Sequence, residues 1–318
     1  MNLPPDFIQT MQSVFGEEGR IFLENLPNLI EQASTRWGLT DVQPVSNLSF
    51  NFAAFAKRGG EEVILKMGIP NRELTSEMAA LKLFNGDGAC QLLECDEERG
   101  FLLLERLVPG RMLSELEDDD ERTLIAAEVM SKLWREVPSV SPAQGGVLAA
   151  GDGGLSNESS NKFIRLSDWF AGLKKIRPHF KGGTGPFPKE ILERVESFLP
   201  ELFADKNVKL MHGDFHHYNI LKSDRGWLVI DPKGVIGPVG YEIGPLMINP
   251  WDSISDWSQF NVRAERRVSI LAERLGWERE KIINWSTAHA ILSAWWSIED
   301  GVDHEYAMQC AEIFSELK

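Results

Sequence analysis

A loop segment of the sequence carries two oxygen-bearing side chains at a spacing that suits chemistry on phosphate. Asp214 follows His-Gly, and Asn219 comes five residues later, so a carboxylate and an amide oxygen can face one shared site. The apolar run 227–230 then ends at Asp231, and a hairpin over 220–230 would return that carboxylate to the side of Asn219. Phosphoryl transfer needs a carboxylate at the attacking hydroxyl and hard oxygen ligands for Mg²⁺. We expect Asp214 to be the catalytic base and Asn219 and Asp231 to bind the metal.

Each of these residues alone has an ordinary structural interpretation. Asp214 and Asp231 could simply cap loops, and His212 and His216 could be core histidines with satisfied hydrogen bonds. The combination is more specific, because a strand leads directly into the second aspartate. It parallels the catalytic loop and the metal-binding aspartate of protein kinases.

The elements that must position these residues fall into two groups. Residues 5–37 have apolar positions at helical spacing and predict one or two N-terminal helices. Short apolar runs between turn signals predict strands, and a further helical pattern lies between them. The predicted strands are 42–45, 50–56, 62–67, 91–95 and 101–105, and the predicted helix is 74–84. This order is typical of a small α+β lobe.

A mostly helical second part follows. Residues 124–137 predict a helix, 138–161 are rich in Gly, Ser and Pro and predict a loop, and helical patterns dominate to the end. Strand-like patches occur only at 219–221 and 227–230. We therefore predict an α+β, two-lobed chain, with a β-rich first lobe over 1–106 and a larger helical lobe over 107–318.

Composition excludes several function classes. The 318 residues carry a net charge of −15, which argues against a nucleic-acid partner and against docking on anionic lipid. No run reaches the roughly 18 apolar residues of a membrane span, and no secretory signal is evident, so a cytoplasmic location is expected. The three cysteines show no metal-ligand spacing and predict reduced thiols. An acidic chain suits a cationic ligand, although acidity also serves solubility alone.

The chain resembles the aminoglycoside phosphotransferases, and within them the group of streptomycin and hydroxyurea-resistance kinases. The resemblance covers nearly the whole chain. Pro238 departs from the pattern, since relatives often carry an acidic residue there. The matching segments are His212-Gly213-Asp214-Phe215-His216-His217 with Asn219-Ile220-Leu221, Ile230-Asp231-Pro232-Lys233-Gly234, Tyr241-Glu242 and Asn249-Pro250.

This resemblance implies a protein-kinase-like fold and a nucleotide site in the first lobe. Lys66 would hold the α- and β-phosphates, with Glu77 as its orienting partner in preference to Glu73. The connection 46–54, including Ser49 and Phe50, would lie over the phosphates, although it is not glycine-rich. Residues 105–107, with Glu105 and Leu107, would form the interlobe hinge that pairs with adenine.

The resemblance says less about the acceptor. It implies that Asp168 and Glu242 contact the substrate, and these are its weakest predictions. Asp152 and Glu158 lie in the region that closes over the acceptor in similar enzymes. Lys233 either places a positive charge near the phosphates and the metal-site carboxylates or is a surface lysine.

The expected activity is transfer of the γ-phosphoryl group of ATP, with Mg²⁺, to a hydroxyl of a cationic, aminoglycoside-like molecule. GTP is not excluded as the donor, and a monomer or weak homodimer is expected. A metabolic kinase of an amino alcohol or sugar is the alternative. A nucleotide-binding pseudokinase is disfavoured, because the lysine, the glutamate and all three loop residues are present.

Overall fold

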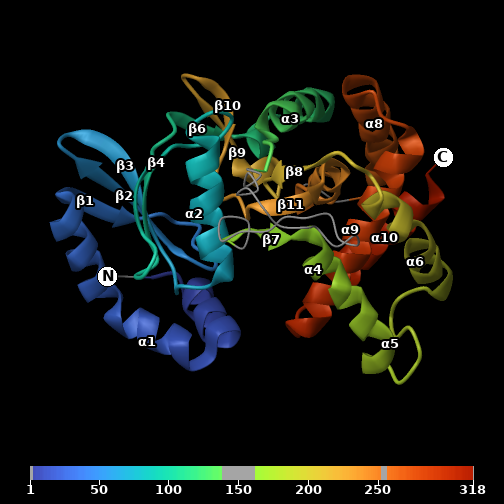
Figure 1. Cartoon of the computed structure of the whole chain (residues 1–318), viewed down its shortest axis with the longest axis horizontal. Coiled ribbons are helices and arrows are strands. Elements are labelled where there is room, and N and C mark those ends of the chain that lie inside the picture. The colour runs from blue at the N-terminus through green and yellow to red at the C-terminus, as the bar shows by residue number, and fades with distance from the viewer. Residues whose placement is uncertain (1–2, 138–161, 252–255, 318) are drawn as a thin grey trace, which may run out of the picture.

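The computed structural model describes residues 3–137, 162–251 and 256–317, and its N-terminal part is built on one antiparallel sheet (Figure 1). Glycines 59 and 60, both with positive φ, form the tight turn between the second and third strands. The spatial order of the strands is β1-β2-β3-β5-β4. They span Leu39–Pro44 (β1), Phe52–Arg58 (β2), Glu61–Met67 (β3), Leu92–Asp96 (β4) and Phe101–Glu105 (β5).

Two helices cover the two faces of this sheet. Helix α1 (Pro5–Trp37) bends at Gly16, whose φ of 55° is non-helical, and wraps the outer face. Helix α2 (Arg72–Phe84) begins at Asn71, whose side chain accepts from the Leu74 N–H at 2.8 Å, and stands between the sheet and the rest of the chain.

The apolar residues of the sheet alternate between two separate cores. Leu102 and Leu104 of β5 face α2 and join the large core of the C-terminal part, whereas Phe101 and Leu103 face α1 and join a smaller core. This period-2 alternation is the expected consequence of strand geometry.

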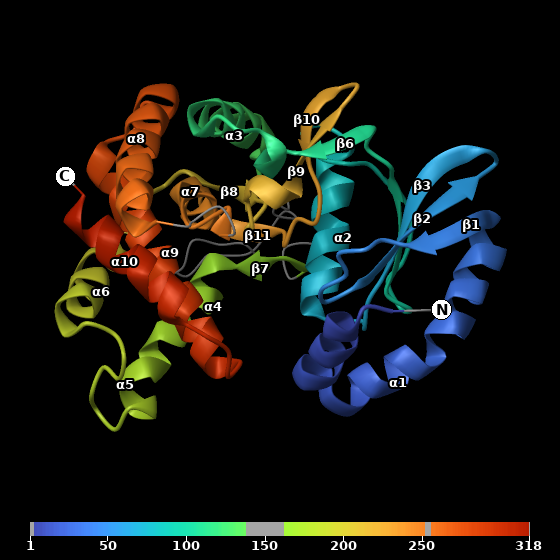
Figure 2. The same cartoon turned by 180° about the vertical axis from the view of Figure 1, so that it is seen from behind.

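The C-terminal part consists of helices around two small sheets, seen from behind in Figure 2. The sheets have the orders β10-β9-β6 and β7-β11-β8. The strands are Pro109–Met112 (β6), Ile164–Arg165 (β7), Val208–Met211 (β8), Ile220–Ser223 (β9), Gly226–Val229 (β10) and Val235–Pro238 (β11). The helices are Asp119–Leu133 (α3), Leu166–Ala171 (α4), Ile176–His179 (α5), Lys189–Phe203 (α6), Ile243–Met247 (α7), Trp257–Leu275 (α8), Arg279–Glu299 (α9) and Glu305–Glu316 (α10), with single 3₁₀ turns at Leu113–Glu115 (η1), Gly172–Lys175 (η3), His217–Asn219 (η4) and Val239–Glu242 (η5).

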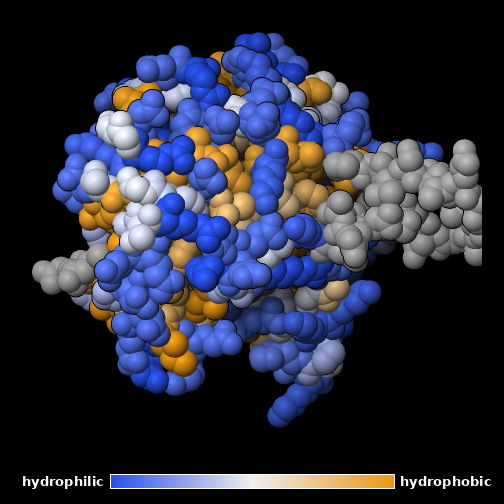
Figure 3. Space-filling view, turned by 60° about the vertical axis from the view of Figure 1, so that its left-hand side comes forward, coloured by the Kyte–Doolittle hydropathy of each residue, from blue (hydrophilic) through white to orange (hydrophobic). Residues whose placement is uncertain are grey.

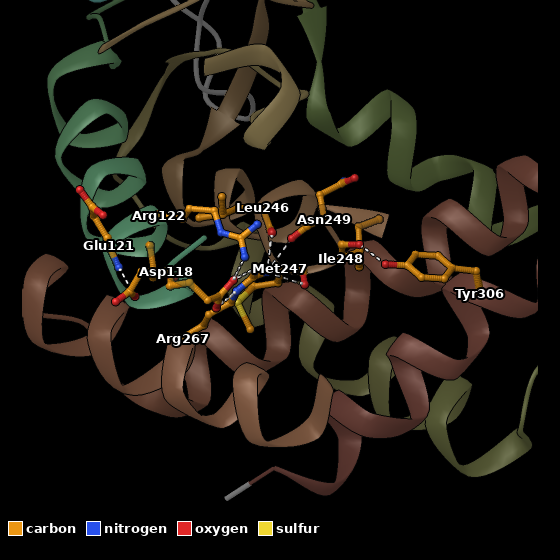
Figure 4. Close-up of polar contacts among 11 residues, drawn as sticks. Asp118, Glu121, Arg122, Leu246, Met247, Ile248, Asn249, Arg267 and Tyr306 are labelled. Atoms are coloured by element: carbon orange, nitrogen blue, oxygen red, sulfur yellow. Dashed lines mark hydrogen bonds and ion pairs between the residues drawn. The ribbon is translucent and has the colours of Figure 1, made fainter. Parts of the chain in front are cut away.

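A buried arginine joins three of these helices (Figure 4). Arg267 of α8 is 1% exposed and makes a two-pronged ion pair with Asp119 of α3, with N–O distances of 2.6 and 2.8 Å. Its third nitrogen donates to carbonyls in the last turn of α7 and just after it, the shortest distance being 2.6 Å to Asn249 O. One side chain therefore holds α3, α8 and the end of α7 together.

The predicted α+β, two-lobed architecture is confirmed, with differences at the element ends. The helix predicted over 124–137 begins earlier, at Asp119, because Asp118 caps it by accepting from the Glu121 N–H at 3.0 Å. It ends at Leu133, since Trp134 has a non-helical ψ of 134°. The predicted loop over 138–161, with Asp152 and Glu158, lies outside the described residues. The lobe boundary at residue 106 stays a prediction.

Figure 3, which brings the N-terminal part forward, shows mostly hydrophilic residues with smaller hydrophobic areas between them. Within the described ranges, none of the helices combines the length and the apolar character that a membrane crossing requires.

Candidate active site

The first part of the candidate site is a buried lysine that joins both parts of the chain. Lys66 lies on β3 and is 7% exposed, and its Nζ donates to the two carboxylate oxygens of Glu77 on α2 at 2.6 and 2.7 Å. The same ammonium also makes a short ion pair with Asp231, which follows β10 in the C-terminal part. The prediction that Glu77 rather than Glu73 lies beside Lys66 agrees with this geometry.

The charges of this cluster support one another. Burial opposes the ammonium form of Lys66, but Asp231 and Glu77 hold its pKa above the ordinary value. Burial likewise opposes ionisation of Asp231, yet Lys66 and Lys233 hold its pKa well below its usual range. Asp231 also has a φ of 58°, a left-handed conformation that is unusual for a residue other than glycine. A fully charged carboxylate is thus fixed in an uncommon backbone conformation, as is frequent at functional sites.

The loop after β8 presents Asp214 next to Asn219. The Asn219 side-chain nitrogen donates to the Asp214 carbonyl at 3.0 Å, which fixes the amide group and leaves its oxygen available for a ligand. His216 Nε2 lies 3.4 Å from an Asp214 carboxylate oxygen. Although burial would raise the pKa of Asp214, His216 and then Lys233 hold it well below its usual range, so this carboxylate is ionised at neutral pH.

His212 is a structural residue of the same loop. It is fully buried, its Nε2 lies 2.8 Å from the Ile230 carbonyl, and its Nδ1 accepts from the Asp214 N–H at 3.1 Å. These partners require the neutral ring with the proton on Nε2, and burial lowers its pKa to about 4. His212 therefore ties the Asp214 loop to the residue that precedes Asp231.

Glu242 supports the catalytic loop from beneath. It is 0% exposed, and its two carboxylate oxygens accept from the backbone N–H groups of His212 at 3.0 Å and Gly213 at 2.7 Å. Burial raises its pKa to about 8 despite these donors. Such a position is at odds with the prediction that Glu242 contacts substrate, because both oxygens are occupied and no solvent reaches them.

Helix α9 packs closely behind Glu242. A Cβ on Gly240 would lie 2.2 Å from the Trp285 ring nitrogen, and a Cβ on Gly244 would lie 2.4 Å from His289 Cβ. The Tyr241 hydroxyl meets His289 Nδ1 at 3.1 Å. The two glycines thus allow α9 to press against the turn that carries Glu242.

Lys233 is partly buried beside the site. Its N–H donates to the His212 carbonyl at 2.7 Å, which joins the segment after Asp231 to the Asp214 loop. Asp231, and then Asp214, raise the pKa of its ammonium above the ordinary value. Of the two interpretations of Lys233, the structure favours a charge beside the metal-site carboxylates.

The remaining predicted residues lie farther from this cluster or act through the backbone. Ser49 and Phe50 are exposed in the connection before β2. Glu105 pairs with Arg225 and accepts from the Gln91 N–H at 2.9 Å, and the Leu107 side chain is buried, so hinge contacts to a nucleotide would come from backbone groups. Asp168 is half-exposed and lies 3.3 Å from Arg72 of α2.

No sequence pattern indicated that Ser76 belongs to the site. Ser76 is fully buried on α2, one position before Glu77, and its hydroxyl bonds to two backbone groups of the C-terminal part. A serine inside an amphipathic helix looks like a tolerated surface residue, and only the packing of α2 shows otherwise.

A family model described as aminoglycoside/hydroxyurea antibiotic resistance kinase matches residues 36–147 and 157–301. The chain belongs to this family. It is 29% identical to a streptomycin 6-kinase of Streptomyces glaucescens over 305 residues, covering 95% of this chain and 92% of the relative. It is 30% identical to a hydroxyurea phosphotransferase of Kitasatospora aureofaciens, covering 95% and 82%. Membership confirms the resemblance drawn from the sequence and makes the chain a phosphotransferase that acts on a hydroxyl.

A solved relative of the fold supports the same architecture. The structure of a mutant aminoglycoside phosphotransferase APH(4)-Ia in complex with ADP and hygromycin B has a TM-score of 0.56 and 15% identity, covering 90% of this chain and 97% of that one. At this identity the likeness concerns the fold alone, which is protein-kinase-like.

Pro238, where this kinase departs from the expected pattern, lies away from Asp214. It is buried at the end of β11, opposite Val208 at the start of β8, whereas Asp214 follows the other end of β8. Three strand residues separate the two ends of this pairing, or about 10 Å. The departure therefore does not alter the catalytic end of the sheet.

Proposed function

We propose that this kinase transfers the γ-phosphoryl group of Mg²⁺-bound ATP to a hydroxyl of a cationic, aminoglycoside-like molecule. The observation that carries the proposal is the convergence of five side chains from both parts of the chain. Lys66 and Glu77 would hold the phosphates, Asn219 and Asp231 would hold the metal, and Asp214 would meet the acceptor. GTP remains the alternative donor to be tested.

The donor set fits Mg²⁺. Asp231 supplies a carboxylate and Asn219 an amide oxygen whose nitrogen is already engaged, and both are hard ligands. Among the described residues, no group of three His, Cys, Asp or Glu is placed to hold an ion by itself. That pattern suits a metal completed by phosphate oxygens and water, as Mg²⁺ in kinases is. When bound, the ion would neutralise charge on the phosphates.

The charge state of Asp214 indicates how it would act. A carboxylate whose pKa lies well below its usual range is a weak base toward a ground-state alcohol. Asp214 would therefore orient the hydroxyl by accepting its hydrogen bond. It would take the proton late, when the new P–O bond makes that hydroxyl acidic. Such a role agrees with the loose transition state of phosphoryl transfer, in which positioning matters more than strong base catalysis.

Charge favours a cationic acceptor. The chain carries −15 overall, and the exposed acid Glu73 on α2 is near enough to Lys233 to raise its pKa, whereas Asp168 is paired with Arg72. A cationic molecule such as an aminosugar would be attracted to this side of the site. The names of the relatives, with streptomycin and hydroxyurea as acceptors, make streptomycin the first candidate.

The test is an assay of nucleoside diphosphate release, as ADP from ATP or GDP from GTP, in the presence of Mg²⁺. The acceptors are streptomycin, a second aminoglycoside, hydroxyurea and a neutral alcohol. We expect phosphorylation of an aminoglycoside, loss of turnover on chelation of Mg²⁺, and a KM for that acceptor that rises with salt more than the KM for ATP. Surface attraction is screened over about 8 Å at physiological ionic strength. Faster, salt-insensitive turnover of a neutral alcohol would instead support the metabolic kinase.

A further inference from the structure

Ser76 joins the helix that carries Glu77 to two backbone segments of the C-terminal part. Its hydroxyl donates to the Gly234 carbonyl at 2.7 Å and accepts from the Ile164 N–H at 3.2 Å. Gly234 ends the segment that begins at Asp231, and Ile164 begins β7. Figures 1 and 2 both show β7 reaching α2 at this point. One fully buried side chain thus connects α2 to both segments.

The approach of the two backbones at this point requires glycine. A Cβ on Gly234 would lie 2.6 Å from the Ser76 carbonyl oxygen, 2.7 Å from Ser76 Oγ and 3.0 Å from Ala80 Cβ. The first of these is a backbone atom of α2, which cannot move aside alone. Gly234 also has a φ of 66°, a region that other residues avoid.

A second link between the same elements is weaker. The Arg72 guanidinium lies 3.4 Å from the Phe163 carbonyl and 3.3 Å from Asp168, and both side chains of that ion pair are about half exposed. An exposed pair at this distance contributes little to a fixed geometry. Of these two polar links between α2 and the C-terminal part, the one at Ser76 is therefore the stronger.

We propose that Ser76 is a positioning residue that fastens α2 against the Asp231 segment, so that Lys66, Glu77 and Asp231 are assembled before any nucleotide binds. The lysine can reach both carboxylates only while α2 stays in this place, because Glu77 comes from α2 and Asp231 from the segment after β10. Kinases in which the equivalent helix moves can be switched by that motion. Because Ser76 holds α2 in place, the nucleotide site of this enzyme is assembled without any movement of that helix. The inference rests on the proposed role of Lys66 in nucleotide binding.

The first experiment compares Ser76→Ala with Ser286→Ala. Ser286 is equally buried, but its hydroxyl donates only within its own helix, to Ile282 at 2.8 Å, so it controls for the loss of a buried hydroxyl. Each variant is titrated with Mg²⁺ and AMP-PNP, and amide hydrogen exchange is measured across the chain. We expect Ser76→Ala to bind the nucleotide about 10- to 100-fold more weakly, since small misplacements are costly. Amides of α2 should exchange faster while those of α9 do not change.

A second pair of variants avoids dependence on the stability of Ser76→Ala. Gly234→Ala adds a Cβ against α2, whereas Gly276→Ala adds one at the same φ of 66° with no atom within 4 Å. The backbone strain is matched, so weaker nucleotide binding together with faster amide exchange of α2, in Gly234→Ala alone, reports the contact with α2.

The outcomes separate the two proposals. Unchanged α2 exchange in Ser76→Ala, or equal nucleotide affinity in both glycine variants, would overturn the fastening role. If the wild-type protein itself binds no AMP-PNP with Mg²⁺, the proposed nucleotide site is wrong, and the exchange of α2 alone then decides the mechanical role of Ser76.

Discussion

At the scale of single residues, the site is a set of opposite charges that hold one another in place. Lys66 lies between Glu77 and Asp231, and Lys233 lies beside Asp231 and Asp214. Removal of one partner leaves a buried charge without compensation. Substitutions should therefore keep shape and alter one interaction at a time.

Asp214→Asn is the clearest substitution of this kind. The amide keeps the size of the carboxylate but cannot accept a proton, so kcat should fall about 10²- to 10⁴-fold. Nucleotide affinity should change little, because Asp214 is assigned to the acceptor. The measurement is steady-state turnover together with AMP-PNP titration. A variant with wild-type kcat would remove Asp214 from the proposed mechanism.

The residues of this cluster differ in how far the sequence could predict them. Asp214, Asn219 and Asp231 were predicted from their spacing, because local chain geometry alone brings them together. Lys66 and Glu77 needed the family resemblance, since a lysine on a strand has no distinctive pattern. The position of Glu242 could not be predicted, because burial under a loop depends on the packing of α9, which is distant in the sequence.

At the scale of elements, α9 forms the rigid support of the catalytic loop. Trp285 and His289 lie one turn apart and press on Gly240 and Gly244, which are also four residues apart. This close contact fixes η5, and through Glu242 it fixes the backbone of His212 and Gly213. The sequence predicted only helical patterns in this part of the chain, and which face of α9 contacts the loop followed only from the fold.

The burial of His289 predicts a pH-dependent effect of its substitution. Burial lowers the pKa of His289 from 6.5 to about 3. Between pH 3 and pH 6.5 the imidazole is therefore protonated in the unfolded chain and neutral in the folded chain. The stability contributed by the neutral ring is complete above pH 6.5 and is lost as the pH falls toward 3. Glutamine does not titrate. The destabilisation caused by His289→Gln should therefore shrink on acidification, by up to about 1.4 kcal/mol per pH unit.

Thermal or urea unfolding of both proteins from pH 7 to pH 4 measures this difference directly. Comparison with the wild type at each pH cancels the other titrating groups, among them Glu242, whose raised pKa acts in the opposite direction. A destabilisation that stays constant over this range would contradict the buried, neutral state of His289.

At the scale of the whole molecule, Arg267 is a buried charged residue that links several helices of the C-terminal part. Its pairing with Asp119 and its bonds to the carbonyls after α7 hold helices that are distant in the sequence (Figure 4). The sequence offered no sign of this role, because Arg267 stands in a charged helix beside Arg266 and Glu265. Only burial distinguishes it from its neighbours.

Arg267→Met and Arg266→Met form a matched pair. Arg266 also pairs with an aspartate of α3, Asp120 at 2.8 Å, but both side chains are well exposed. We expect Arg267→Met to lower the free energy of unfolding by about 3 kcal/mol, because Asp119 and several carbonyls lose a buried partner. The loss for Arg266→Met should stay within about 1 kcal/mol. Urea denaturation measures both, and similar losses would show that burial does not decide the difference.

The two cores of the N-terminal sheet have a consequence for the order in which the chain folds. Leu74, Met78, Leu81 and Phe84 of α2 belong to the same apolar core as the C-terminal helices, whereas α1 and the opposite face of the sheet form a core of their own. Cooperative units follow such cores more closely than they follow the outline of lobes. Helix α2 should thus become ordered together with the catalytic part, and α1 should close over the outer face as a separate step. Helix α2 with Glu77 would then be assembled within the larger cooperative unit. Val63, Leu65 and Met67 of β3, the strand that carries Lys66, lie instead in the smaller core, so the placing of that lysine would depend on the closing of α1.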